Sequence, residues 1–427
     1  MRDRKTGSSK SSPEDRSTAE TRSGRRPMVR TSRLVGLTTA ALLAATPMAS
    51  AEPSADDMLH PVSRKGLELT EQSKSYRDRV AKLDKKLDNT SIDSVVENAP
   101  HAAKPTGRGF DWTGGEQKGE TWVPQGITGS SDAHPGSGKY GKHRIIATSW
   151  YDNEGKKDCW FWCDPTKRGV RVSFVNYDNP DKPRFAHVQL VVPDGNASIR
   201  PLVHTKGGEQ ESLHAGGIAW VGNYLYVADT NGGIRQFDVR HVWKGEPDED
   251  HVHFGVHGNK VKAADYRYAI PQVGMYRSTG SAKPTFSSVS VDHTRGHRAL
   301  VTGEYKENAK GGRIVRWPLR GEQPATDDKQ VVRPRKKDKK EEGNVFRVDD
   351  RQMQGAVSYE NTFFTSHSNK NERGHWRRIR VGWKTGAHGD MPKKPEDVSY
   401  NPASDRAWWL TEQAGQRHVR YTSKAMG

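Results

Sequence analysis

Residues 216–239 read GGIAWVGNYLYVADTNGGIRQFDV. Three short runs rich in aliphatic and aromatic residues, 218–221, 224–229 and 234–239, are separated by Gly222-Asn223 and by Asn231-Gly232-Gly233. Asn and Gly tolerate the positive φ angles that tight hairpins require, and β-branched and aromatic residues favour strands. The pattern therefore predicts three antiparallel strands joined by two turns, which is a β-meander.

The same unit recurs along the chain. Its first strands are anchored by Gly126-Ile127, Gly217-Ile218, Ser288-Val289, Gly355-Ala356 and Asp397-Val398. The second strands are predicted at 144–149, 224–229, 298–304, 362–367 and 406–412, and the third strands at 170–175, 234–239, 313–319, 376–381 and 418–422. Fourth strands are expected at 187–192, 268–274 and 345–348, and residues 108–123 are expected to supply the outer strand of the last unit.

A meander cannot bury both of its faces alone, whereas radial stacking buries faces between neighbours and protects strand edges. The sequence thus predicts an all-β fold, a β-propeller of five blades, with six if a blade lies hidden in residues 176–215 or 240–285. The 42 Gly, 23 Pro and 12 Trp of the 427-residue chain suit such a turn-rich β protein.

The N-terminal region carries an export signal. Residues 34–51 form a small-residue apolar run that follows Arg30 and Arg33 and ends in Ala49-Ser50-Ala51. This is typical of a secretory signal peptide cleaved after Ala51. Sec or Tat export, and Met1 or Met28 as the start, remain alternatives. Residues 1–51 are assigned to the leader and signal peptide, 52–107 to an N-terminal helical arm and linker, and 108–427 to the propeller domain.

Residues 64–88 read as one amphipathic helix, because apolar residues recur at helical spacing from Leu69 to Leu87. We expect this arm to dock on the propeller, with a short coiled-coil dimer as the alternative. The polar average excludes a polytopic membrane protein, and after cleavage we expect a secreted monomer without an integral membrane anchor.

The basic charge has a limited meaning. Removing residues 1–51 removes ten basic and four acidic residues, which lowers the formal net charge from +17 to +11. Much of the remainder lies in RPRKKDKK at 333–340, within a basic loop at about 322–343 that has no interleaved aromatic residues. The pattern indicates a solvated extracellular surface and no specific nucleic-acid binding, with adhesion to polyanions as the alternative.

The two cysteines, Cys159 and Cys163, flank Trp160-Phe161-Trp162. In a secreted protein, a close pair of cysteines is expected to form a disulfide, here a local loop staple. Two reduced, buried cysteines are the alternative.

The last unit resembles a known repeat. Residues 395–398 read PEDV and residues 407–412 read AWWLTE, with Asn401-Pro402 in the turn between them. They resemble the repeat of streptogramin-lyase and related NHL or gluconolactonase-like propellers, although Asp397 stands at the family glycine. Residues 108–422 also resemble secreted propeller-like proteins of actinobacteria of uncharacterised function, through HAGGI at 214–218 and LYVADT at 225–230.

A propeller gathers equivalent strand ends around its axis, so distant residues can converge there. The matching positions are Asp229, Glu304, His367 and Glu412, with Gln125, His214 and Gln354 near the first-strand anchors. The resemblance implies a channel cation with an acid and a His, and these oxygen and imidazole groups suit Ca²⁺ or Mg²⁺ or acid–base work. An inert, wet channel is the alternative.

Two functions follow. The leading hypothesis is a non-catalytic extracellular protein that binds a glycan, a small ligand or a protein partner, using Gln125, His214, Asp229 and Gln354. The rival is a cation-dependent lactonase or lyase, with Glu304, His367 and Glu412 as catalytic residues and Asp229, Glu304 and His367 as metal ligands.

Two further features have competing interpretations. His251 and His253, with His257 nearby, suggest a metal pair on one face of a strand or a solvated His-rich loop. Six tryptophans suggest sugar stacking or packing between blades: Trp112, Trp122, Trp150, Trp160, Trp162 and Trp243. The sequence contains neither a Gly-x-Ser-x-Gly elbow nor a phosphate loop.

Overall fold

The computed structural model describes residues 59–153, 167–206, 209–247, 253–335, 344–370, 372–381 and 386–427. Several predicted features lie outside these residues, namely the signal peptide, Cys159 and Cys163, Trp160 and Trp162, His251, and positions 336–343 of the basic loop. No described helix is long and apolar enough to cross a membrane.

The described residues contain five antiparallel meanders in succession, and we call them blades A to E. Blade A contains β7 (Trp122–Gly129), β8 (Ile145–Asp152), β9 (Val170–Asn176) and β10 (Arg184–Pro193). Blade B contains β14 (Ile218–Val221), β15 (Tyr224–Asp229), β16 (Gly233–Asp238) and β20 (Tyr268–Ser278). Blade C contains β21 (Phe286–Asp292), β22 (Ala299–Glu304), β23 (Gly312–Arg320) and β26 (Val345–Val348).

Blade D contains β27 (Met353–Tyr359), β28 (Thr362–His367), β29 (Arg373–Arg380) and β30 (Ala387–Lys393). Blade E contains β31 (Pro395–Asn401), β32 (Arg406–Thr411) and β33 (His418–Ser423), and β6 (Gly109–Asp111) pairs with β33 as its next strand. The segment 108–123 therefore does supply an outer strand to the last unit, as predicted.

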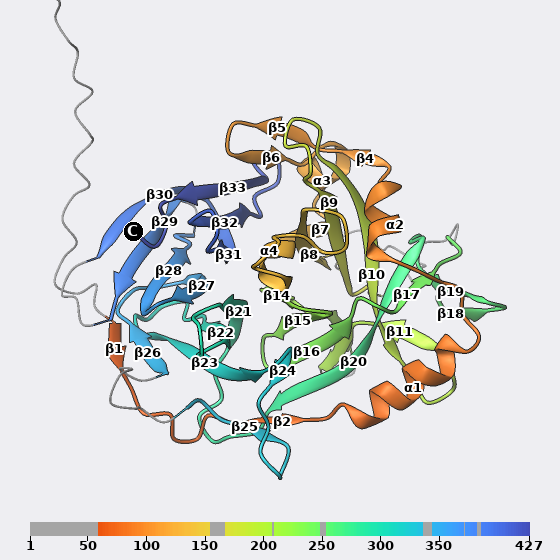
Figure 1. Ribbon diagram of the computed structural model, residues 1–427, viewed down its shortest axis with the longest axis horizontal. Coiled ribbons are helices and arrows are strands. Elements are labelled where there is room, and N and C mark those ends of the chain that lie inside the picture. The colour runs from red at the N-terminus through yellow and green to blue at the C-terminus, as the bar shows by residue number, and fades with distance from the viewer. Residues whose placement is uncertain are drawn as a thin grey trace, which may run out of the picture. The chain divides into compact units, whose positions relative to one another are not determined.

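The blades are arranged around an axis (Figure 1). Their first strands contact one another in the order β7, β14, β21, β27, β31 and back to β7. Because the ring of first strands closes, each blade packs its faces against two neighbours. The all-β propeller fold predicted from the sequence is confirmed.

The segments considered for a sixth blade form fourth strands and small hairpins. Between residues 176 and 215 lie β10, β11 (Ile199–Pro201) and a hairpin of β12 (Val203–Lys206) with β13 (Glu209–Ser212). Between residues 240 and 285 lie β17 (Val242–Lys244), a hairpin of β18 (Phe254–His257) with β19 (Lys260–Ala263), and β20.

The N-terminal segment runs along the outside of four blades (Figure 1). Here β1 (Leu59–Pro61) pairs with β26 of blade C, and β2 (Leu69–Glu71) pairs with β20 of blade B. Next, β3 (Asn89–Thr90) pairs with β17, β4 (His101–Ala102) pairs with β10 of blade A, and β5 (Lys104–Thr106) pairs with β6 of blade E. The segment thus fastens blades that are distant in sequence. Two short strands complete this edge, β24 (Gln323–Pro324) on β23 and β25 (Val331–Val332) on β2.

The predicted helix 64–88 is much shorter in the structure. Helix α1 spans Lys74–Asp84, because Leu69 lies in β2 and is paired with blade B. Val80 and Leu83 of α1 are buried against Trp243 and neighbouring apolar residues of blades A and B. The remaining helices are α2 (Ile92–Glu97), α3 (Gly114–Lys118) and α4 (Ser130–Ala133).

The first strands pack backbone against backbone around the axis. A Cβ added to Gly217 would lie 2.2 Å from the backbone N of Val289, and one added to Gly126 would lie 2.7 Å from the backbone N of Ile218. These contacts require glycine, since real Cβ atoms do not approach so closely. The backbones of the first strands therefore fill the space around the axis at Gly126 and Gly217. Polar residues lie toward the two ends of the axis.

Candidate functional site

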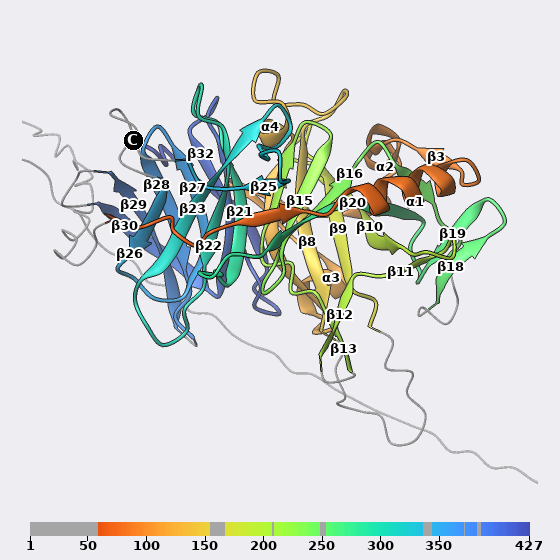
Figure 2. The same ribbon diagram turned by 90° about the horizontal axis from the view of Figure 1, so that it is seen from below.

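We call the end of the axis where the first strands begin the mouth. The residues that precede the five strand anchors lie there in equivalent positions: Gln125, Gly216, Ser287, Gln354 and Glu396. Second strands run antiparallel to first strands, so they end at the mouth. The β12–β13 hairpin and α3 lie on one side of the blades and α4 on the other (Figure 2).

Gln125 of blade A meets Glu412, which follows the second strand of blade E. The Gln125 Nε2 group donates a hydrogen bond to Glu412 Oε2 at 2.8 Å. Lys394 Nζ lies 3.1 Å from Glu412 Oε1, and the Glu412 side chain is 18% exposed. Two residues singled out in the sequence, 287 positions apart, thus come together at the mouth.

Glu396 is the unusual member of this group. It is 3% exposed, and its carboxyl group forms no hydrogen bond with any residue that the structure describes. Burial raises the pKa of Glu396 well above its ordinary value, and the nearby charge of Glu412 raises it further. Gln125 Oε1 is also buried without a partner. The mouth therefore combines a buried acid with a raised pKa, a second carboxyl group paired with Lys394, and an unpartnered amide oxygen.

Glu396 was not among the residues predicted from the sequence, although the repeat pattern contained a signal for it. Glu396 precedes the anchor Asp397-Val398, as Gln125 precedes Gly126-Ile127 and Gln354 precedes Gly355-Ala356. Extending the comparison of repeats by one position would have placed it in the same ring.

His214 and Tyr151 lie beside this group. Their ring centroids are 4.6 Å apart. Burial lowers the pKa of His214, with the charge of Glu412 opposing that change. Burial, with the charges of Glu412 and Glu396, raises the pKa of Tyr151. Both rings are therefore neutral near pH 7 and within electrostatic reach of the carboxyl groups.

Asp229 and Glu304 are held within their own blades. Asp229 Oδ2 lies 2.7 Å from Arg235 Nη2, and Glu304 Oε1 lies 2.7 Å from Arg313 Nη2. Arginines on the neighbouring third strands thus pair with both carboxylates. Gln354 Nε2 donates to Ser368 Oγ at 3.3 Å.

The expected metal set of Asp229, Glu304 and His367 does not form. Among the described residues, one group of three metal-type ligands is found, and it joins His367 to Asp350 and His375 with ligand atoms within 4.8 Å of one another. His367 therefore lies close to Asp350, which precedes blade D, and to His375 of the same blade. It does not lie with Asp229 and Glu304, the ligands predicted from the other two blades.

The bonding in this group does not suit a metal ion. His367 Nδ1 donates to the Arg351 carbonyl at 2.9 Å, and its Nε2 accepts from the Thr365 hydroxyl at 2.8 Å, so both ring nitrogens are used. Asp350 Oδ2 accepts a hydrogen bond of 2.5 Å from Arg377 Nε. A divalent cation would have to compete with this guanidinium for the same oxygen.

Ser173 and His187 of blade A form a hydrogen-bonded row with Glu116 of α3. Ser173 Oγ lies 2.8 Å from His187 Nδ1, and His187 Nε2 lies 3.1 Å from Glu116 Oε1. Ser173 is completely buried between β9 and β10. A nucleophile must reach its substrate, so this row has a structural role.

The other candidates have packing or surface roles. Trp112, Trp122, Trp150 and Trp243 are buried, which agrees with packing between elements and gives no stacking surface. His257 is exposed and bonds to Glu246 Oε2 at 2.8 Å, and His253 lies just before β18.

A second buried acid lies toward the opposite end of the axis. Asp132 of α4 accepts hydrogen bonds at its Oδ2 atom from Thr128 Oγ1 at 2.7 Å and from Ser399 Oγ at 2.6 Å. His293 Nε2 lies 3.3 Å from its Oδ1 atom. Asp132 thus joins three blades through a fully bonded carboxylate.

No protein-family model matches the sequence, and no curated protein matches it. Solved structures give weak matches. A GH43_1 enzyme from Xanthomonas citri has a TM-score of 0.28 and 9% identity, over 81% of this chain and 92% of that chain. Hydrazine synthase of Kuenenia stuttgartiensis has a TM-score of 0.27 and 10% identity, over 63% and 99%.

The computationally designed Ika8 protein has a TM-score of 0.25 and 9% identity, over 75% of this chain and 100% of that chain. Likenesses at this level carry no conclusion about function. The fold assignment therefore rests on the strand order of this chain, and any function must be argued from its side chains.

Proposed function

We propose that the chain is a secreted, monomeric binding protein whose mouth holds a neutral, hydroxyl-rich ligand such as a glycan. The observation that supports this most is Gln125 Oε1, a buried oxygen without a hydrogen-bond partner, at the same mouth as the 3% exposed Glu396, whose carboxyl group forms no hydrogen bond with a described residue. Buried polar groups in native proteins are normally hydrogen-bonded, so an unpartnered pair at one site suggests that a ligand completes it.

The chemistry of these groups favours a hydroxyl. A protonated Glu396 can donate one hydrogen bond, whereas Gln125 Oε1 and Glu412 can only accept. A hydroxyl both donates and accepts, so neighbouring hydroxyls on one ligand can satisfy all three groups.

The cellular setting is part of the proposal. The signal-peptide pattern and the mature charge of +11 favour a soluble extracellular protein, and a Cys159–Cys163 disulfide would suit that compartment. The ligand then comes from a cell wall or from extracellular polysaccharide.

The test uses the mature protein, residues 52–427, titrated with purified wall polysaccharide and neutral oligosaccharides by calorimetry. We expect Glu396→Ala to weaken binding about tenfold or more, because it removes a buried hydrogen-bonding group. Glu396→Gln is expected to retain binding, since an amide also donates. The control Glu120→Ala removes an exposed acid outside the group. Equal binding by wild type and Glu396→Ala, or no binding by wild type, would overturn the proposal.

A second candidate function is acid–base catalysis by the same residues. Glu396 is buried and its pKa is raised, whereas the Glu412 side chain is 18% exposed and lies 3.1 Å from Lys394 Nζ, so the two carboxyl groups have different environments. Such a pair can protonate a leaving oxygen and activate a water, as opening a lactone or cleaving an acetal requires.

Catalysis and binding predict different behaviour for one variant. Glu396→Gln retains a donor but cannot release a proton, so it would abolish turnover of a lactone or aryl glycoside while binding persists. Lack of turnover by wild type across such a panel leaves binding as the better account.

A further inference from the structure

The mouth carries a second ring of residues, which the second strands supply. In blades A, C, D and E the register pairs the residue just before each mouth residue with a residue at the end of the second strand: Pro124 with Trp150, Phe286 with Glu304, Met353 with His367, and Pro395 with Thr411. The residue that follows each of these strand ends therefore lies at the mouth, and Thr230 follows the second strand of blade B. These equivalent, partly exposed residues are Tyr151, Thr230, Tyr305, Ser368 and Glu412.

Thr230 and Tyr305 are held against the same short segment at the start of β21. The Thr230 carbonyl accepts a hydrogen bond from the Phe286 N–H at 2.9 Å. The Tyr305 N–H donates to the carbonyl of the preceding residue, Thr285, at 3.1 Å. Residues 285 and 286 lead directly to Ser287 of the mouth. Blades B and C thus bring a threonine and a tyrosine to neighbouring positions of the second ring.

Tyr305 is partly exposed and differs from the other tyrosine of the second ring. Its side chain forms no aromatic or cation–π contact and no hydrogen bond with any residue that the structure describes. Tyr151, by contrast, packs its ring against His214 with the centroids 4.6 Å apart. Burial raises the pKa of Tyr305, and the charges of Glu307 and Glu396 raise it further. Tyr305 is therefore neutral at neutral pH, with the Glu396 carboxyl group within electrostatic reach.

Thr230 supplies a hydrogen-bonding group that the fold leaves unused. Its Oγ1 atom is buried and has no hydrogen-bond partner among the described residues. A hydroxyl both donates and accepts hydrogen bonds, so Thr230 is complementary to a ligand hydroxyl. Because buried polar atoms are normally satisfied, Thr230 Oγ1 joins Gln125 Oε1 as a second group at the mouth that a ligand would complete.

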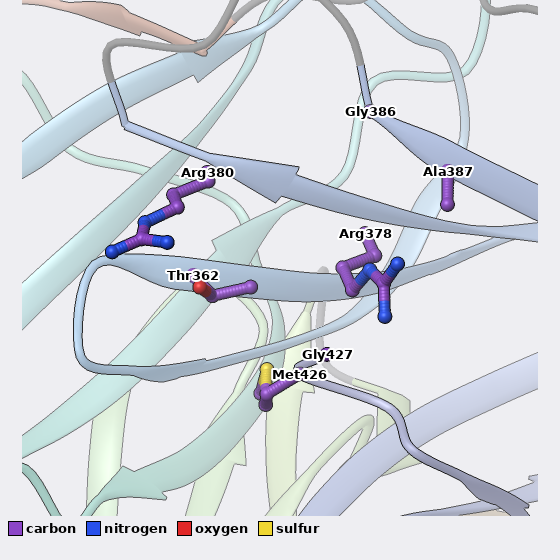
Figure 3. A pocket seen from close by; sticks show the side chains of 7 residues that line it. All are labelled: Thr362, Arg378, Arg380, Gly386, Ala387, Met426 and Gly427. Atoms are coloured by element: carbon purple, nitrogen blue, oxygen red, sulfur yellow. The ribbon is translucent and has the colours of Figure 1, made fainter.

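Stacking requires an aromatic ring, and the cavity on blade D provides none among its described lining. This cavity lies on the third and fourth strands and measures about 320 Å³ (Figure 3). Thr362 begins β28 whereas His367 ends it at the mouth, so the cavity lies toward the opposite end of the blade. The described residues that line it include no aromatic side chain: Thr362, Arg378, Arg380, Gly386, Ala387, Met426 and Gly427. Tyr305 therefore offers a sugar ring a surface that these residues do not.

We propose that Tyr305 determines the specificity of the mouth by stacking on the apolar face of a pyranose ring, while Thr230 hydrogen-bonds to a hydroxyl of the same sugar. This role rests on the proposed function and narrows its ligand from a hydroxyl-rich molecule to a cyclic sugar. The C–H groups of a pyranose form a flat apolar face that packs on an aromatic ring. An open-chain polyol has similar hydroxyl groups but no such face.

The test compares cyclic sugars with their open-chain counterparts by calorimetry on the mature protein, residues 52–427. The methyl pyranosides of glucose, galactose and mannose are each titrated beside the alditol of the same configuration, namely glucitol, galactitol and mannitol. The variants Tyr305→Ala and Tyr305→Leu remove the flat ring, whereas Tyr305→Phe keeps it. The control is Tyr359→Ala, which deletes a partly exposed tyrosine at the far end of β27.

We expect the wild type to bind at least one pyranoside about fivefold or more tightly than its alditol, because only the cyclic sugar can stack. Tyr305→Ala and Tyr305→Leu should each bring this ratio close to one, whereas Tyr305→Phe and Tyr359→Ala should retain it. Thermal unfolding without sugar detects a variant that fails to fold, and the second variant then provides the result. Thr230→Val should weaken binding of pyranoside and alditol by a similar factor, since it removes a hydrogen bond and no stacking surface.

Two outcomes would contradict the role of Tyr305 and leave the proposed function standing. One is pyranoside binding that depends on Glu396 but keeps its full preference over the alditol in Tyr305→Ala and Tyr305→Leu. The other is equal affinity of the wild type for every pyranoside and its alditol. If the wild type bound neither these sugars nor wall polysaccharide, the proposed function would fail, and the role of Tyr305 with it.

Discussion

Two buried acids lie toward opposite ends of the propeller axis and have opposite surroundings. Asp132, at the α4 end, accepts hydrogen bonds from Thr128 and Ser399 and faces His293. Glu396, at the mouth, is 3% exposed and has no hydrogen-bond partner among the described residues. The same fold thus contains one acid bonded to several blades and one that the blades leave unbonded.

This difference distinguishes buried polar groups that stabilise the fold from those that are available to bind a ligand. Burying a carboxyl group without hydrogen bonds costs several kcal/mol, so such a group reduces stability, whereas a bonded one holds its neighbours in place. Asp397 lies between these two cases: its Oδ2 accepts backbone N–H groups of Ile127 and Ile218 at 3.1 Å each, whereas its buried Oδ1 has no partner among the described residues.

The largest expected effect is at the bonded acid. Asp132→Ala would leave the Thr128 and Ser399 hydroxyls and His293 without their buried acceptor, and we expect it to lower the free energy of unfolding by about 3 kcal/mol or more. Urea denaturation of the mature protein measures this change. A loss below about 1 kcal/mol would remove the structural role assigned to Asp132.

The next effect is a pH dependence at the unbonded acid. The ordinary pKa of the Glu396 carboxyl is 4.5, and the folded protein raises it. Between these two values the folded state holds a proton that the unfolded state releases. The stability contribution of Glu396 is therefore complete below pH 4.5 and declines as the pH rises.

Glu396→Gln removes this titration. We expect the variant to gain stability relative to wild type above pH 4.5, by up to about 1.4 kcal/mol per pH unit until the folded pKa is reached. Urea denaturation from pH 4 to pH 8 measures the difference, with Glu120→Gln as a control that leaves the slope unchanged. Parallel curves for wild type and Glu396→Gln would show that Glu396 is ionised in the folded state.

The smallest effect concerns a single bond at the α4 end. Ser399→Ala deletes one of the two hydroxyl donors to Asp132 Oδ2, and we expect a loss of about 1 kcal/mol. Combined with Asp132→Ala, it should cost less than the sum of the two single changes, because both remove the same interaction. Additive losses would show that Ser399 and Asp132 stabilise the fold independently.

Local patterns predicted the blades well because each meander is specified by nearby residues. Tyr224–Asp229 matched the predicted strand, and Gly222-Asn223 lies at the turn before it. The N-terminal segment, residues 59–106, could not be predicted from local patterns. Leu69 has a helical spacing to later apolar residues, but it pairs with Ser278 of blade B, which lies 209 positions away (278 − 69).

The mouth was predicted in part. Repeat alignment found Gln125 and Glu412, which do meet, because equivalent strand positions converge around an axis. The same alignment grouped Glu304 and Asp229 with them, but arginines on neighbouring strands bind these acids within their own blades. Pairing of this kind depends on side-chain reach across a sheet, which periodicity does not encode.

The most direct test of the account is the protonation state of Glu396. The carboxyl carbons of a ¹³C-glutamate-labelled mature protein can be followed by NMR from pH 4 to pH 8, with the Glu396 signal assigned by its loss in Glu396→Gln. The account predicts that this signal stays in its neutral position at pH 6 and that Glu412→Gln lowers its pKa, since the charge of Glu412 helps to raise it. Titration of Glu396 near pH 4.5, together with the exposed glutamates, would contradict it.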